Sequence, residues 1–141
     1  MLKLVHTSIK GEFFKKERVR AMQIRKIYKN VNPGLLFDEV KGFATKQGVS
    51  IGEETIQSYS LPTDSSSSIR RGTIIFHGKG KTGETETEYL RAHIEGSETG
   101  ETKLILDINT ELFPKDKVTA LQNDLDFIFS SYEIKSLHKG G

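Results

Sequence analysis

Residues 103–132, KLILDINTELFPKDKVTALQNDLDFIFSSY, carry the clearest structural pattern in this chain of 141 residues. In residues 103–112 apolar side chains and Thr110 occupy every second position, with Ile105 as the exception, which predicts a strand with one face on a core and one in water. After Pro114 the apolar side chains recur at intervals of three and four, which predicts an amphipathic helix to about Tyr132. The apolar stripe of this helix consists of Val118, Leu121, Leu125, Ile128 and Tyr132.

Three further strands are expected before this unit, over residues 49–61, 69–77 and 86–95. Turn-rich stretches at 62–68 and 78–83 separate them, and another at 96–100 precedes the strand at 103–112. The four serines at 65–68 predict a flexible hairpin loop. Strands that follow one another through short turns are expected to pair antiparallel.

The N-terminal part of the chain is ambiguous between strand and helix over residues 13–29, and we favour a strand over roughly residues 18–29. Residues 13–29 fit a helix less well than residues 18–29 fit a strand, because the helix face would be less apolar. Residues 2–10 alternate weakly, which suggests an additional strand. The strand over residues 18–29 would present one apolar face, made of Met22, Ile24 and Tyr28.

A helix is expected between Asn32 and Gly48. The Asn32 side chain suits a helix N-cap, and Pro33 suits the first helical position, where a backbone N–H is not needed. Gly48 suits the left-handed residue that ends a helix. The apolar face of this helix consists of Leu36, Val40, Phe43 and Ala44, with Gln47 at its end.

The element order is therefore strand, helix, four strands, helix: an α+β fold with the long C-terminal helix packed across one antiparallel sheet. We expect a single domain over residues 1–141, with its core at about 18–137 and a flexible tail at 138–141. This order resembles the architecture of TATA-binding-protein-like folds, of the START or birch-pollen-allergen (helix-grip) superfamily and of the kinase-associated C-terminal domain. The helix-grip resemblance implies a pocket for apolar ligands between sheet and C-terminal helix. The kinase-associated domain implies a basic surface that meets anionic lipid.

The composition excludes several kinds of site. The chain has no cysteine, so disulfides, thiolate nucleophiles and cysteine-based metal sites are impossible. No run approaches 18 apolar residues, so no transmembrane helix is expected. The first residues lack the apolar core of a signal peptide. These observations favour a cytoplasmic protein and leave its oligomeric state open.

Charge is unevenly distributed, although the formal net charge is only +2. Between Lys10 and Lys29 there are eight Lys or Arg and two Glu, whereas between Glu84 and Glu101 there are six Glu and one Arg. The basic segment 15–29 is either a solvated or self-paired surface, or a site for the phosphates of anionic membrane lipid or nucleic acid. The candidate anion-binding residues are Lys15, Lys16, Arg18, Arg20, Arg25, Lys26 and Lys29.

No motif predicts catalysis, a metal or a cofactor. The loop HGKGKTG at 77–83 resembles a phosphate-binding loop, but that motif requires glycine where Ile75 stands and a helix immediately afterwards. The four histidines lack the spacing of metal ligands, and His93 is expected on the polar side of its strand, exposed to solvent. Acid–base chemistry would need a buried or coupled carboxylate. The carboxylates that we consider for it are Glu53, Glu54 and Asp107.

These patterns favour a non-enzymatic binding module that holds an apolar or lipid-like small molecule between the sheet and the C-terminal helix. The alternative is an interaction module that binds anionic membrane or nucleic acid through segment 15–29. A third hypothesis, a helix-grip-type cyclase or hydrolase, requires a titratable group that points into the interior. The residues expected to line the pocket are Phe43, Ile74, Phe76, Leu90, Ile94, Leu106, Ile108, Leu121, Leu125 and Ile128.

Overall fold

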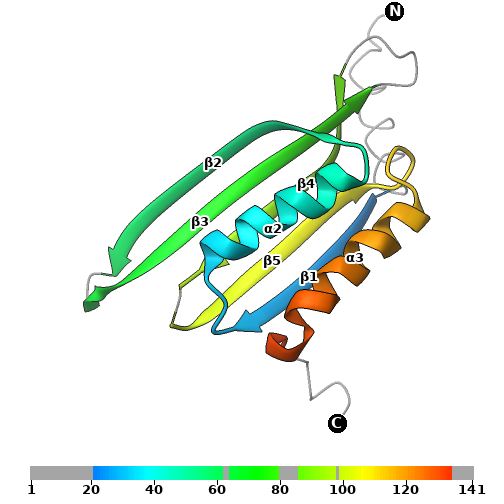
Figure 1. Cartoon of the computed structure of the whole chain (residues 1–141). Coiled ribbons are helices and arrows are strands. Elements are labelled where there is room, and N and C mark those ends of the chain that lie inside the picture. The colour runs from blue at the N-terminus through cyan, green and yellow to red at the C-terminus, as the bar shows by residue number, and fades with distance from the viewer. Residues whose placement is uncertain (1–20, 62–63, 80–85, 98, 135–141) are drawn as a thin grey trace, which may run out of the picture.

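A five-stranded antiparallel sheet carries two helices on one face in the computed structural model, which describes residues 21–61, 64–79, 86–97 and 99–134 (Figure 1). The strand order is β1-β5-β4-β3-β2, so the first strand lies beside the last. This confirms the α+β class and the C-terminal helix packed across the sheet, and the likeness to the families named above is one of topology. The elements are β1 (Ala21–Lys29), α2 (Pro33–Lys46), β2 (Ser50–Leu61), β3 (Asp64–Lys79), β4 (Glu86–Gly96), β5 (Glu101–Asn109), α3 (Lys115–Phe129) and the 3₁₀ helix η1 (Ser130–Tyr132).

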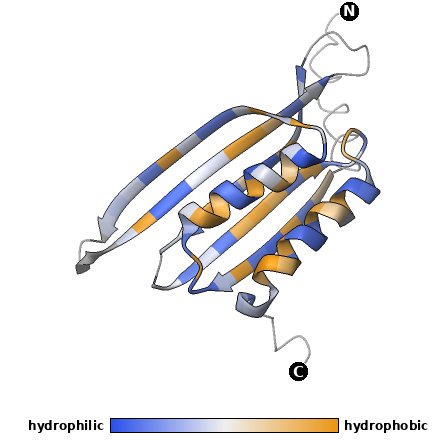
Figure 2. Cartoon of the chain, in the orientation of Figure 1, coloured by the Kyte–Doolittle hydropathy of each residue, from blue (hydrophilic) through white to orange (hydrophobic). Residues whose placement is uncertain are grey.

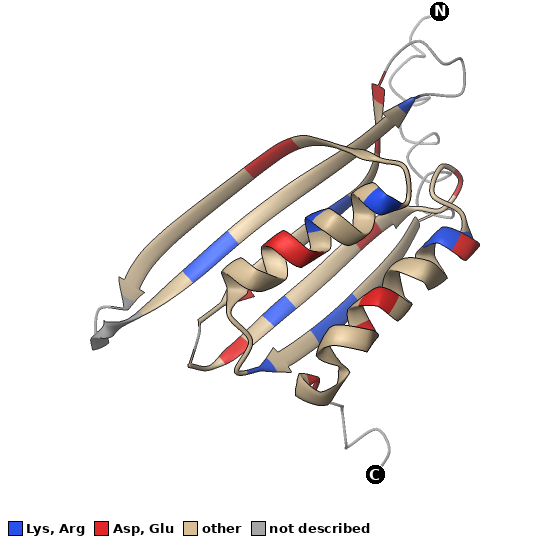
Figure 3. Cartoon of the chain, in the orientation of Figure 1, with Lys and Arg blue, Asp and Glu red and all other residues tan. Residues whose placement is uncertain are grey.

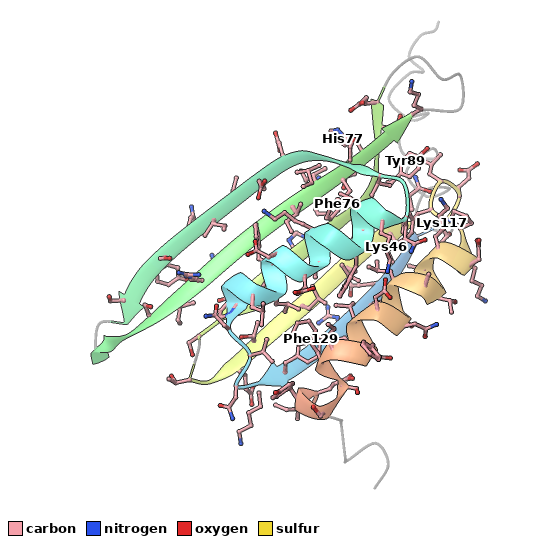
Figure 4. All side chains as sticks on the ribbon, viewed as in Figure 1. Lys46, Phe76, His77, Tyr89, Lys117 and Phe129 are labelled. Atoms are coloured by element: carbon pink, nitrogen blue, oxygen red, sulfur yellow. The ribbon has the colours of Figure 1, made fainter. Side chains whose placement is uncertain are left out.

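The helix α2 begins and ends where the sequence predicts. The Asn32 side chain accepts a hydrogen bond from the Gly34 amide at 2.7 Å, and Pro33 is the first helical residue. Gly48 has a φ of 102°, a left-handed conformation that glycine adopts without steric cost. The two helices are also tied to each other, because Lys46 pairs with Asp124 at 2.9 Å (Figure 4).

The core lies between the helices and the inner face of the sheet. Alternation in β4 and β5 is confirmed, because every second side chain is buried against the helices. Figure 2 shows apolar residues recurring along both helices and along the strands of the sheet that they cover. Burial of this kind stabilises the fold by roughly 25 cal/mol for each Å² of apolar surface removed from water. The buried apolar residues of β4 and β5 are Leu90, Ala92, Ile94, Leu104, Leu106 and Ile108.

Two strand boundaries differ from the prediction. β3 begins at Asp64, so the serine run at 65–68 lies in a strand and is not a hairpin loop. It does so because the pairing with β2 continues past the core, to Ser60 opposite Ser68. β5 ends at Asn109, where the amides of Leu112 and Phe113 both turn back to the Asn109 carbonyl. The expected strand at 2–10, the start of the one at 18–29 and the tail at 138–141 lie outside the described residues.

The buried stripe of α3 also differs from the prediction at its end. Val118, Leu121 and Leu125 are buried as expected, but the next buried residue is Phe129, at 2 % exposed, and not Ile128, at 41 %. The Phe129 ring packs on the Tyr28 ring of β1, with 5.4 Å between the centroids. The helix ends at Phe129, and the tighter 3₁₀ turn that follows leaves Tyr132 exposed.

The two edge strands of the sheet differ in whether other residues pair with their free sides. The free side of β1 is covered at its end, because the Ile134 amide donates to the Ile27 carbonyl at 2.8 Å and Tyr28 forms an isolated bridge with Glu133. The free side of β2 pairs with no strand in the described part of the chain. Figure 1 shows the β2–β3 hairpin projecting beyond the start of α2.

Candidate functional site

The residues predicted to line an internal pocket lie almost entirely in the packed core. Phe43 is half-buried against that core, and Ile128 is exposed on the outer side of α3. The other eight belong to one cluster of buried side chains that contact each other between sheet and helices. These eight, each no more than 2 % exposed, are Ile74, Phe76, Leu90, Ile94, Leu106, Ile108, Leu121 and Leu125.

A small apolar hollow lies where α2 begins, between Phe37 and the hairpin residues Ile56 and Gly72. Of the ten predicted pocket residues it includes only Ile94. Its space of about 10 Å³ is comparable to the volume that one water molecule needs. It therefore has no room for a lipid-like ligand.

The larger hollows lie on the face of the sheet that carries no helix. One, of about 240 Å³, is bounded on opposite sides by Ile27 and Ile69. The other, of about 160 Å³, is bounded by Thr73, His93 and Ile105. Glu95 and Lys103 line both, so the two hollows adjoin and form one shallow depression across β1, β5, β4 and β3. We call this depression the open-face groove.

Lys103 occupies the middle of the open-face groove. Its neighbours across the strands are Ile27 on β1 and Glu95 on β4. Glu95 is held by Arg71, 3.3 Å away, and the hydrogen bond to this carboxylate raises the pKa of the Arg71 guanidinium. Lys103 itself forms no ion pair with any residue that the structure describes. The groove therefore contains an exposed cation that forms no ion pair within the described residues, beside apolar side chains and near the carboxylates of Glu95 and Glu101.

A chain of hydrogen bonds crosses the sheet at one end of the groove. Gln23 donates to Asp107 at 2.7 Å, His93 Nε2 lies 3.2 Å from the other oxygen of Asp107, and Thr73 Oγ1 lies 3.4 Å from His93 Nδ1. The order hydroxyl, imidazole, carboxylate is that of a hydrolytic triad. The side chains of His93 and Asp107 are 39 % and 44 % exposed, however, so water competes for these bonds. This row of hydrogen bonds holds the side chains that form the wall of the groove, and we assign no reaction to it.

The basic segment divides between the two faces of β1. Arg25 is exposed on the open face and donates to Gln23, and Lys29 is exposed at the end of the strand. Lys26 points the other way, toward α3, and lies 3.3 Å from Asp126 and 3.5 Å from Glu133. Lys26 therefore has carboxylate partners inside the molecule. Lys15, Lys16, Arg18 and Arg20 lie outside the described residues.

Sequence reasoning placed His93 and Asp107 on the polar side of their strands but missed their contact. The alternation gives the face of each residue, whereas their proximity depends on β4 and β5 being neighbours in a particular register. Knowledge of the strand order would have revealed the contact between His93 and Asp107. Lys103 was missed for a different reason, since a single lysine on a polar strand face is common. Figure 3 shows basic residues of β1, β3 and β5 interspersed with acidic ones on neighbouring elements.

Glu53 and Glu54, considered for acid–base chemistry, are exposed on β2. Among the residues described, no three His, Asp or Glu side chains converge to hold a metal ion. No helix in the described ranges has the length and apolar character that crossing a bilayer requires. Comparisons with protein-family models, with curated proteins and with solved structures found no match to this chain.

Proposed function

We propose that this chain is a non-enzymatic binding module that takes a lipid-like small molecule with an anionic headgroup in the open-face groove. The observation that carries the proposal is Lys103, an exposed cation without an ion-pair partner in the described chain, set between two hollows lined partly by isoleucine. A phosphate or carboxylate headgroup on Lys103 would leave an acyl chain free to lie along the groove.

The apolar walls suit such a chain. Ile27, Ile69 and Ile105 are partly exposed, so a ligand that covers them removes apolar surface from water. Burial of each CH₂ group contributes about 0.8 kcal/mol at most, and less in a shallow site. The headgroup contact is worth less than a buried ion pair, because salt and water screen charges at the surface. Micromolar to millimolar affinity follows from these terms.

The same class of ligand would fit the interior less easily. Between the sheet and α3 it would have to displace side chains such as Leu106 and Leu121, which have no exposed surface. Close-packed interiors do not admit a chain without a cavity or a rearrangement. The open face requires no such displacement, which is why we place the ligand there.

The test is a titration of the protein with dodecyl phosphate below its critical micelle concentration, followed by amide chemical shifts. Shifts should cluster on β4 and β5 around Lys103. The variant Lys103→Gln should weaken binding by about 5- to 20-fold, as expected for the loss of a charge-assisted contact of roughly 1–2 kcal/mol. The matched control is Lys115→Gln, at the exposed first residue of α3, which should leave affinity unchanged.

Two results would contradict the proposal. One is the absence of saturable shifts up to millimolar ligand. The other is an equal loss of affinity in Lys103→Gln and Lys115→Gln, which would indicate non-specific attraction to a basic protein. Shifts centred on Leu121 and Leu125 would instead place the ligand in the interior.

A further inference from the structure

We propose that β2 pairs antiparallel with β2 of a second copy of this chain, so that two sheets join edge to edge about a two-fold axis. The inference concerns assembly and does not depend on the ligand proposed above. It starts from the exposure of β2, in which every residue from Ser50 to Ser60 is exposed. A strand with an unpaired edge offers a row of free backbone donors and acceptors to another strand.

The part of β2 that is open to pairing is residues 55–60, TIQSYS. Before it, the register with β3 shifts between Ile51 and Glu53, and Glu53 and Glu54 add two negative charges. Bulges and charges are the usual protection of an edge strand. From Thr55 to Ser60 the register with β3 is regular and the residues are uncharged, without proline or glycine. This stretch lacks the common protective features.

A second copy is favoured because the segment is complementary to itself. A two-fold axis perpendicular to a continuous sheet keeps the helices of both copies on one side, so each residue must oppose one that faces the same way. An axis through Gln57 achieves this, with Thr55 opposite Tyr59 and Ile56 opposite Ser58 of the other copy. No like charges then oppose each other. Pairing would remove from solvent part of the apolar surface of Ile56 and Tyr59, which are 53 % and 40 % exposed in the single chain.

The opposite edge explains why assembly would stop at two copies. A sheet with two bare edges can add copies without limit, as fibres do. Here the free side of β1 is bonded at its end, where Ile27 and Tyr28 pair with Ile134 and Glu133. Among the described residues, β2 is therefore the edge that no segment covers, and pairing of β2 with β2 gives a closed dimer.

Cysteine cross-linking tests the proposal directly, because the chain has no cysteine of its own. In Gln57→Cys, the two thiols would meet across the axis at a Cα separation of about 5 Å, within the range that a disulfide spans. Mild oxidation should convert most of the protein to a dimer of twice the 15.9 kDa chain mass. Ser58→Cys should cross-link instead if the axis passes one residue further on. Thr119→Cys, exposed on α3, is the control and should form no disulfide-linked dimer.

Sedimentation velocity provides the second measurement, without any covalent bond. The unmodified chain should show a concentration-dependent monomer–dimer equilibrium. Gln57→Lys, which sets two lysines opposite each other, should raise the dimer dissociation constant at least about tenfold. Thr119→Lys should leave it unchanged. Three results would overturn the proposal. The chain could be monomeric up to millimolar concentration, or it could form open-ended aggregates. The third result is cross-linking no faster at residues 57 and 58 than at 119.

Discussion

β1 and β2 are the two outer strands of one sheet, yet they differ in how far other parts of the molecule cover them. β1 is held on its free side by the segment after α3 and carries a partly buried lysine and a buried tyrosine. β2 is exposed from Ser50 to Ser60, and the hairpin that it forms with β3 projects beyond the start of α2 (Figure 1). The difference shows that the segment after α3 covers the end of one edge, whereas no segment of the described chain covers the other.

The largest expected effect is the difference in stability loss between two variants, each of which removes one aromatic side chain at one edge of the sheet. Phe129→Ala empties the space beside Tyr28 and should lower the free energy of unfolding by about 3–5 kcal/mol. Tyr59→Ala, at the bare edge, should cost less than about 1 kcal/mol because Tyr59 is 40 % exposed. Urea unfolding at low protein concentration measures both. Similar losses in the two variants would show that the edges do not differ in packing.

A smaller effect is expected from the charges under the covered edge. Lys26 is 14 % exposed, and Lys26→Gln would leave Glu133, 13 % exposed, without this cation. The expected loss is about 1–3 kcal/mol, accompanied by faster hydrogen exchange at the Ile134 amide. Lys29→Gln, on the same strand but exposed, should change neither quantity measurably. Unchanged exchange in Lys26→Gln would mean that the segment is held by its backbone bonds alone.

The smallest effect is a pH dependence. Burial, together with the Glu133 and Asp126 carboxylates, raises the pKa of the Tyr28 hydroxyl above its ordinary value near 10. Above pH 10 the unfolded chain loses this proton while the folded chain keeps it, so stability falls as pH rises, by about 1 kcal/mol at pH 11. The fall should be shallower in Tyr28→Phe than in the unmodified chain, measured by urea unfolding between pH 8 and 11. If the free energy of unfolding falls equally with pH in both proteins, the Tyr28 hydroxyl is more exposed to water than the structure indicates.

Much of the fold followed from local pattern. The alternation in β4 and β5 gave the faces of these strands correctly, and the cap at Asn32 gave the start of α2, because each depends on residues close in the chain. The length of the β2–β3 hairpin did not follow, because its outer half buries no apolar face that a periodic pattern could reveal. The end of the α3 stripe was also missed. Ile128 and Phe129 both continue the helical spacing from Leu125, and only the ring of Tyr28 decides between them.

The candidate site was less predictable than the fold. Its groove arises from side chains of four strands that face away from the core, where hydropathy carries little information. The contact between His93 and Asp107 requires knowledge of which strands are neighbours. The predicted pocket residues, in contrast, were apolar residues on inward faces. Most of them proved to be core, since the same pattern marks a core and the lining of an apolar cavity.

The strand order has a consequence for how the chain folds. β2, β3, β4 and β5 pair with their neighbours in sequence, so short loops close these contacts. β1 pairs with β5, which brings Ala21 opposite Asn109 and Lys29 opposite Glu101. Closing so long a loop costs more chain entropy than a hairpin does, and non-local contacts of this kind slow folding. The edge that is best protected in the folded molecule is therefore the one whose strand pairing is entropically the most costly to form.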